Sequence, residues 1–190
     1  GHYDYSGKNN IIGQLIKAIT KKHKCLVSYD SPKREKENKF YIEPEKLLTY
    51  NGGLYVIFYV RNQKEFWLLA VHRILNLKVY DEVFPDDHPF DEKDFVKNRF
   101  GLFSGSLEKI RLKFDKSIRH YIEHKHWNSS QEFISDKKGN LILKMEAPIT
   151  PELTAWILGW NKNVKVLKPK KLTNDIKDLI ISMKKQYKMK

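Results

Sequence analysis

The stretch Gly52–Tyr80, GGLYVIFYVRNQKEFWLLAVHRILNLKVY, decides the fold of the first half of the chain. Its apolar and polar residues alternate in the manner of half-buried strands, in runs at about 54–61, 65–70 and 73–80. His72 and Arg73 stand side by side at the start of the last run, and a strand sends neighbouring side chains to opposite faces. We therefore expect one of these two polar groups to be exposed or to meet a ligand.

The residues before this stretch predict a helix and further strands. Asn10 is placed to cap a helix with one apolar face, formed by Ile11, Ile12, Leu15, Ile16 and Ile19. The pattern then predicts a strand at 25–30, an exposed charged loop at 31–38, strands at 39–43 and 46–50, and a tight hairpin turn at Asn51-Gly52-Gly53. One helix followed by several short strands predicts a small β-barrel or a strongly curved sheet.

The second half predicts a separate α+β domain. An acidic segment holds a short helix over Glu92–Arg99, and SGS at 104–106 resembles a linker. Beyond it the pattern predicts a strand, a helix at 115–127, a hairpin across Asp136–Asn140, a helix begun by Thr150 and Pro151, a strand, and a last helix at 172–188. The order βαββαβ with a tail helix is typical of a ferredoxin-like domain. The predicted boundaries are 10–82 for the barrel, 83–106 for the linker and 107–190 for the ferredoxin-like domain.

Composition limits the classes of protein that this chain can belong to. Its 190 residues are 41% hydrophobic and 13% aromatic, which indicates a globular protein. No apolar run approaches the length of a membrane span, and the opening residues lack the apolar core of a signal peptide. The single cysteine, Cys25, excludes an internal disulfide and is expected to be a buried structural thiol. We expect a cytoplasmic protein with no membrane contact.

The positive charge is concentrated in the second half. Residues 1–105 hold 17 Lys/Arg and 14 Asp/Glu, net +3, whereas residues 106–190 hold 19 and 9, net +10. Such asymmetry favours a polyanionic partner. Lys168, Lys170 and Lys171 in the run KPKK are weak candidates for contact with a nucleic-acid backbone, and the alternative is a solvated surface.

Catalytic and cofactor motifs are missing from the sequence. It has no HExxH, paired CxxC, GxxxxGK[ST], GxGxxG or GxSxG pattern, so we expect neither an enzyme nor a cofactor. His120 and His124 stand four residues apart, which suits a metal, but nothing marks further ligands. A solvated basic helix face is the preferred interpretation, and no metal site is predicted.

Several landmarks together resemble a known family. VSYD, IEPEKLLTYNG, GGLYVIFYV and LLAVHRILNLKV resemble the WYL domain of bacterial transcriptional regulators. RLKFD, SSQEF, KKGNLIL, AWILGW and VKVLKPKKL resemble the C-terminal extension of those proteins, the WCX domain. The resemblance implies an Sm-like barrel that senses a nucleotide or single-stranded nucleic acid. It also implies a homodimer, a frequent role in phage defence, and operator DNA bound by an N-terminal helix-turn-helix that we expect to be absent from this chain.

Some of the family's characteristic residues are present in this sequence and others are replaced. The Trp-Tyr-Leu signature falls on Leu54-Tyr55-Val56, the motif His-Arg-Ile is intact at 72–74, and an arginine that is usual earlier falls on Trp67. The resemblance and the aromatic pattern give six candidate ligand-binding residues: Arg73, His72, Tyr55, Tyr29, Tyr59 and Trp67. Rings of this kind stack on bases and a guanidinium binds phosphate. For Tyr55 and Trp67 the alternative is a place in the core.

The function expected from these observations is regulatory. In the leading interpretation this chain senses a ligand and dimerises, and so modulates DNA binding by a separate helix-turn-helix. The alternative is an accessory regulator that binds a nucleic-acid effector complex, such as a phage-defence or CRISPR nuclease, without binding an operator.

Overall fold

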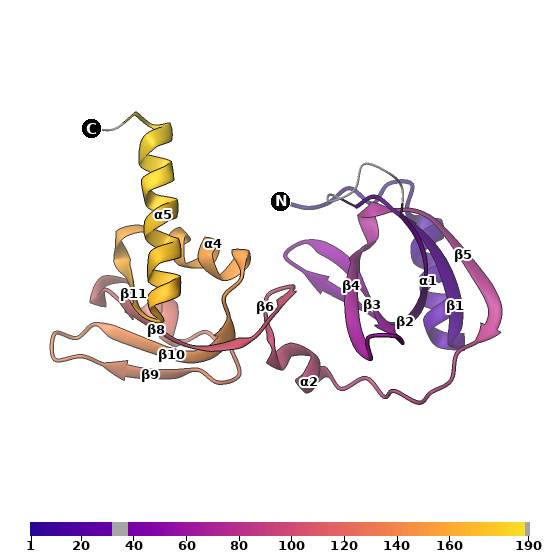
Figure 1. Cartoon of the computed structure of the whole chain (residues 1–190), viewed down its shortest axis with the longest axis horizontal. Coiled ribbons are helices and arrows are strands. Elements are labelled where there is room, and N and C mark those ends of the chain that lie inside the picture. The colour runs from indigo at the N-terminus through magenta and orange to yellow at the C-terminus, as the bar shows by residue number, and fades with distance from the viewer. Residues whose placement is uncertain (32–37, 189–190) are drawn as a thin grey trace. The chain divides into compact units, whose positions relative to one another are not determined.

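The computed structural model describes residues 1–31 and 38–188, and these form two compact units (Figure 1). Unit 1 comprises Gly1–Phe90 and unit 2 comprises Asp91–Lys190. The division falls inside the segment 83–106 that the sequence marks as a linker. The predicted charged loop at 31–38 lies outside the described residues except for its two ends.

Unit 1 combines a leading helix with antiparallel strands. Its elements are α1 (Asn9–Lys21), β1 (His23–Tyr29), β2 (Asn38–Tyr50), β3 (Gly53–Val60), β4 (Glu65–Ala70), the 3-10 helix η1 (Val71–Arg73) and β5 (Ile74–Val83). The strands form one sheet in the order β4-β3-β2-β1-β5. The predicted helix and strands are thus present, with all ladders antiparallel.

Strand β2 is bent and serves both halves of this sheet. Its first part pairs with β1 and its second part pairs with β3, with a register shift between Pro44 and Lys46. The sequence predicts two strands here, at 39–43 and 46–50. In the structure they are one continuous strand, and the register shift lies where the two predicted strands were separated. A two-residue turn then joins Tyr50 to Gly53, and Asn51 (φ 46°) and Gly52 (φ 76°) supply the left-handed conformations that it needs.

The sheet of unit 1 is not closed into a barrel. Within residues 1–31 and 38–188 no ladder joins β4 to β5, so these two strands are its edges. The reason is η1, which turns the chain after Ala70 and sends β5 across to β1, where Ile74 pairs with Tyr29. The sequence predicts a small barrel or a strongly curved sheet, and the described residues form an open curved sheet.

The same turn corrects the expectation for His72 and Arg73. Both lie in η1 and not at the start of a strand, because β5 begins only at Ile74. Strand alternation therefore does not apply to them.

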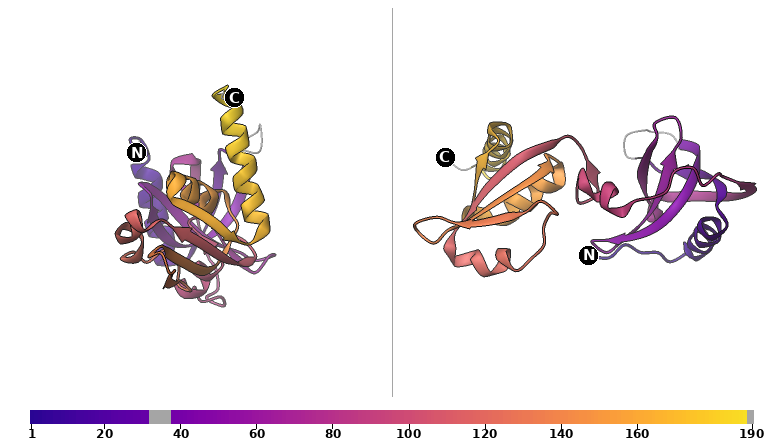
Figure 2. Two further views of the ribbon diagram at one scale, coloured as in Figure 1. Left: turned by 90° about the vertical axis from the view of Figure 1, so that its left-hand side faces the viewer. Right: turned by 90° about the horizontal axis from the view of Figure 1, so that it is seen from below.

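The core of unit 1 lies between α1 and the sheet. Leu15 and Ala18 of α1 are fully buried against a cluster that includes Cys25, Val27 and Ile74. The helix contacts β1, β2 and β5, and its amphipathic sequence explains why one face is buried (Figure 2). Cys25 is buried, as predicted, and burial raises the pKa of its thiol to about 12.

Unit 2 has helices on one face of an antiparallel sheet. Its elements are α2 (Glu92–Lys97), β6 (Arg99–Phe100), β7 (Phe103–Ser104), β8 (Leu107–Phe114), η2 (Lys116–Ile118), α3 (Arg119–Glu123), β9 (Glu132–Ser135), β10 (Leu141–Pro148), α4 (Pro151–Gly159), η3 (Asn161–Asn163), β11 (Val164–Lys168) and α5 (Lys170–Gln186). The main sheet has the order β11-β8-β10-β9. From β8 to α5 the succession of strands and helices is the one that the sequence predicts, although the helix expected at 115–127 is replaced by the short η2 and α3.

The core of unit 2 explains this arrangement. Ile110, Leu112 and Phe114 alternate along β8 and face buried residues of the helices, among them Ile157 of α4 and Leu172 of α5. Figure 1 shows α4 and α5 on the same side of the sheet. None of the helices in the described residues combines the length and the apolar character that crossing a membrane requires.

Candidate functional site

A pocket of about 650 Å³ opens on the curved sheet of unit 1. Its lining includes six aromatic residues among polar and aliphatic ones: Tyr29, Phe40, Tyr41, Phe58, Tyr59 and Trp67. Buried core residues form part of it, so the pocket reaches the apolar interior. A volume of this size suits a mononucleotide or another small planar ligand.

Trp67 is placed at this pocket by strand pairing at a sheet edge. It lies on β4 directly opposite Phe58 of β3, and it shares the face of Leu69 two residues on. Because β4 is an edge strand, Trp67 remains 42% exposed although its neighbours are buried. The alternative that Trp67 is a core residue is therefore wrong, and its side chain is partly accessible to a ligand.

Tyr29 connects the pocket to Arg73. The Tyr29 hydroxyl accepts a hydrogen bond from the Ala70 backbone N–H at 3.2 Å, and burial raises the pKa of this phenol. The guanidinium carbon of Arg73 lies 5.7 Å from the centre of the Tyr29 ring. Within the part of the chain that the structure describes, no carboxylate forms an ion pair with Arg73.

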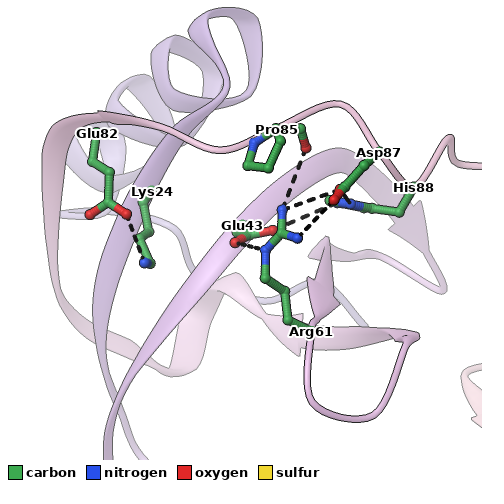
Figure 3. Close-up of polar contacts among 7 residues, drawn as sticks. All are labelled: Lys24, Glu43, Arg61, Glu82, Pro85, Asp87 and His88. Atoms are coloured by element: carbon green, nitrogen blue, oxygen red, sulfur yellow. Dashed lines mark hydrogen bonds and ion pairs between the residues drawn. The ribbon is translucent and has the colours of Figure 1, made fainter.

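Arg61 brings a guanidinium to the lining of the pocket. It follows β3, and its Nε donates a hydrogen bond to Glu43 Oε1 at 2.6 Å (Figure 3). Its Nη1 and Nη2 reach Asp87 at 3.1 and 3.3 Å. These carboxylates raise the pKa of Arg61, Glu43 having the larger effect, and the Arg61 hydrogen bond lowers the pKa of Asp87 to about 2.

The segment after β5 is held on the sheet by this network. His88 stacks on Tyr59 with ring centroids 3.7 Å apart, and its Nε2 lies 3.7 Å from Glu43 Oε2. The Glu43 side chain is only 7% exposed, and Oε2 has no hydrogen-bond partner among the described residues. Asp87 and His88 thus tie the chain that continues towards unit 2 to residues at the pocket (Figure 3).

His72 belongs to a different cluster. Its ring stacks on Tyr3 at 4.0 Å and meets Tyr5 edge-on at 6.5 Å, while its Nδ1 is buried without a hydrogen-bond partner among the described residues. Burial lowers the pKa of His72, with smaller contributions from Arg73 and Lys8. His72 is not among the residues that line the pocket.

The structure therefore divides the predicted residues. Tyr29, Tyr59 and Trp67 line the pocket. Arg73 does not line it, and its guanidinium carbon lies 5.7 Å from the centre of the Tyr29 ring. Tyr55 is buried on β3 and does not line the pocket. The three predicted backbone-contact lysines are far along the chain in unit 2, at the end of β11 and the start of α5: Lys168, Lys170 and Lys171.

Sequence reasoning missed Arg61, Glu43 and Asp87. The sequence places Arg61 at the last position of the strand predicted at 54–61 and Asp87 in an acidic surface segment. The available signal was the placement of Arg61 two residues beyond Tyr59 at the end of the same strand. Nothing in the sequence pairs either residue with Glu43, which lies 18 residues before Arg61.

Comparison with known proteins adds two domain matches. The model of the WYL domain matches residues 10–79, and that of the WCX domain matches residues 106–183. No curated protein matches the sequence.

Two solved structures are similar to the chain at low sequence identity. The proteasome accessory factor B/C (PafBC) of Arthrobacter aurescens is 14% identical over 98% of this chain and 28% of that chain, with a TM-score of 0.42. A crystal structure described as a CRISPR Cas-related protein is 12% identical over 97% of this chain and 53% of that chain, with a TM-score of 0.62. The second likeness shows a shared fold. This chain spans about half or less of the length of either.

Proposed function

Because this chain belongs to the proteins that join a WYL domain to a WCX domain, we propose that it is the ligand-sensing part of a transcriptional regulator. The ligand that we propose is a nucleotide or a short single strand of nucleic acid, bound in the pocket of unit 1. Operator DNA would be bound by another domain of the full protein, and the regulator would act as a homodimer.

The observation that carries this proposal is the aromatic pocket with an exposed tryptophan. Trp67 is 42% exposed and lines the pocket together with Tyr29 and Tyr59, although the Tyr59 ring is already stacked on His88. Stacking between a base and such a ring contributes roughly 1–3 kcal/mol per base and accepts any base. A flat heterocycle therefore fits this wall better than an aliphatic ligand.

Two guanidinium groups support an anionic ligand. Arg73 has no ion-paired carboxylate in the described chain, so its charge is available to a phosphate across the Tyr29 ring. Arg61 is already shared between Glu43 and Asp87. A phosphate that reached Arg61 would compete with Asp87, which is the more exposed of these two carboxylates.

This competition suggests how binding would be communicated. Asp87 and His88 belong to the segment that leads from β5 into unit 2. If a ligand phosphate displaces Asp87 from Arg61, the segment loses one of its attachments to the sheet. The ligand would then shift the balance between two arrangements of the chain, as differential binding requires.

For the two units we propose the named folds that the family implies. Unit 1 would be an open relative of the Sm-like barrel, and unit 2 would be a ferredoxin-like domain, in keeping with the sheet order β11-β8-β10-β9.

The test uses the fluorescence of Trp67, which is the only tryptophan of unit 1. The other three, Trp127, Trp156 and Trp160, pack in the core of unit 2. Adenosine monophosphate and a short oligothymidylate are titrated against the chain while tryptophan emission is measured. We expect saturable quenching, lost in Trp67→Phe and retained in the control Trp160→Phe.

Affinity is measured separately by calorimetry. Arg73→Gln is expected to weaken binding of the same probes about tenfold or more, since a charge-assisted contact is lost. Arg119→Gln, which removes an arginine in unit 2, is the matched control. Equal affinity of wild type and Arg73→Gln, or quenching that survives in Trp67→Phe, would count against the assigned site. A full-length protein with no DNA-binding domain would favour the accessory regulator.

A further inference from the structure

The sheet of unit 2 has a second face, opposite the one that packs on the helices. On β8 the core residues Ile110 and Leu112 alternate with Lys109, Arg111 and Lys113, which therefore point away from the core. The strand register adds Lys144, Lys165 and Lys168 to the same face. We call these six residues the basic face: Lys109, Arg111, Lys113, Lys144, Lys165 and Lys168.

The basic face places like charges directly beside one another. Arg111 is paired in register with Lys144 on β10 and with Lys168 on β11, and Lys113 is paired with Lys165. Like charges at opposed positions of an antiparallel pair destabilise the sheet. The acidic neighbours are Glu132, which lies 3.7 Å from Lys144, Glu146, which is opposite Lys109, and Asp115 and Asp136, whose pKa values are lowered mainly by hydrogen bonds and further by Lys113.

Arg111 adds an unsatisfied donor to this face. Its Nε is buried and has no hydrogen-bond partner among the described residues. A buried guanidinium N–H without an acceptor carries a desolvation cost, and no carboxylate neutralises the charge of this guanidinium through that N–H. The charge therefore favours an anion at the same group. The cations follow β8 at every second residue, about 6.8 Å apart, a repeat close to that of successive phosphates along a nucleic-acid strand.

We propose that the basic face of unit 2 binds the phosphate backbone of nucleic acid. The contact is independent of base sequence, because the face has cations and the aliphatic residues Ile134 and Ile142 but no aromatic ring on its described rows. The basic face is distinct from the pocket of unit 1, which is too small to admit a double helix. This proposal does not rest on the function proposed for that pocket. Lys168 is the one predicted backbone-contact lysine that belongs to it.

The experiment measures binding of a short fluorescein-labelled DNA duplex to the full chain by anisotropy. The duplex excludes the pocket of unit 1 from the measurement. The face variant combines Arg111→Gln, Lys165→Gln and Lys168→Gln. The control variant combines Lys177→Gln, Lys184→Gln and Lys185→Gln, which removes the same charge from α5.

We expect the face variant to bind about tenfold or more weakly at low salt, and the plot of log K against log[salt] to become shallower by about 2 to 3. The control variant is expected to lose less than about threefold. Equal losses in the two variants would mean that only the net charge of the chain matters, and this would overturn the proposal. No loss of affinity in the face variant would also overturn it. So would a face variant that loses binding to phosphatidylserine vesicles but not to the duplex.

A second readout is stability. Because the face variant removes repulsion between Arg111, Lys168 and their neighbours, its melting temperature at low salt should equal or exceed that of wild type. A large decrease would mean that these cations serve the fold, and it would overturn the proposal.

Discussion

Arg61 on the turn after β3 donates its Nε–H to Glu43 of β2 across 2.6 Å, and this ion pair neutralises a carboxylate that is almost fully buried. The bond links two neighbouring strands at the rim of the pocket. It also gives Arg61 a fixed orientation from which its remaining N–H groups reach Asp87.

Removing Arg61 should destabilise the fold more than removing an exposed cation. Arg61→Ala leaves the Glu43 carboxylate buried without its donor, and we expect the free energy of unfolding to fall by about 1–3 kcal/mol. Lys22→Ala, which breaks a surface ion pair with Asp86, should cost less than about 1 kcal/mol. Urea unfolding measures both. If Arg61→Ala costs no more than Lys22→Ala, the ion pair does not stabilise the sheet.

Removing Asp87 should instead strengthen binding of anions in the pocket. Asp87→Asn leaves the Arg61–Glu43 pair intact and frees the outer N–H groups of Arg61 from a negative charge. We expect adenosine monophosphate to bind several-fold more tightly, as measured by calorimetry. Asp86→Asn, which alters an adjacent exposed carboxylate, is the control. Unchanged or weaker binding to Asp87→Asn would exclude competition at Arg61.

Stability should decrease in mildly acidic solution because of His72. Burial lowers its pKa in the folded chain, so below about pH 6.5 the unfolded chain takes up the proton first. The free energy of unfolding should therefore decline as pH falls from about 7 towards the lowered pKa, and be fully present above that range.

The measurement is urea unfolding across this pH range. His72→Phe keeps a ring against Tyr3 but cannot titrate, so its decline should be smaller than that of wild type. His124→Gln alters an exposed histidine and should behave like wild type. Parallel pH profiles for wild type and His72→Phe would contradict this account.

The thiol of Cys25 should be inert in the folded chain. It is fully buried with a pKa of about 12, so almost no thiolate forms near pH 8. Ellman's reagent should react with it only after unfolding in guanidinium chloride. Since Cys25 is the only cysteine, the signal has a single source. Rapid reaction of the native chain would show that β1 opens readily.

The start of α4 should depend on one hydroxyl. Thr150 is buried, and its Oγ1 accepts the Leu153 N–H at 3.1 Å, which satisfies one of the free donors of the helix. Thr150→Ala should cost about 1 kcal/mol in the free energy of unfolding, whereas Thr150→Ser should keep most of it. Equal stability of the two variants would assign no role to this cap.

Much of the secondary structure followed from local patterns in the sequence. Apolar spacing predicts α1 and the strands on either side of the Asn51–Gly52 turn, and the pair Thr150 and Pro151 predicts the start of α4. The helix expected at 115–127 is an exception. Its apolar spacing continues past Glu123, but α3 ends there and the chain turns at His124.

Only part of the candidate site could be predicted from local sequence patterns. Tyr29, Tyr59 and Trp67 could be chosen because aromatic residues on alternating strands are recognisable one at a time. His72 was grouped with them by its position beside Arg73, yet η1 directs it to Tyr3.

The sequence by itself determined most of the helices and strands, the two-part organisation and the concentration of charge in the second half, because each depends on neighbouring residues or on composition. Only the tertiary structure decided that the sheet of unit 1 stays open, that Arg61 is shared by Glu43 and Asp87, and that lysines from three strands adjoin one another in unit 2. These relationships depend on where the chain turns and on strand register, and such long-range geometry leaves no periodic trace in the order of the residues.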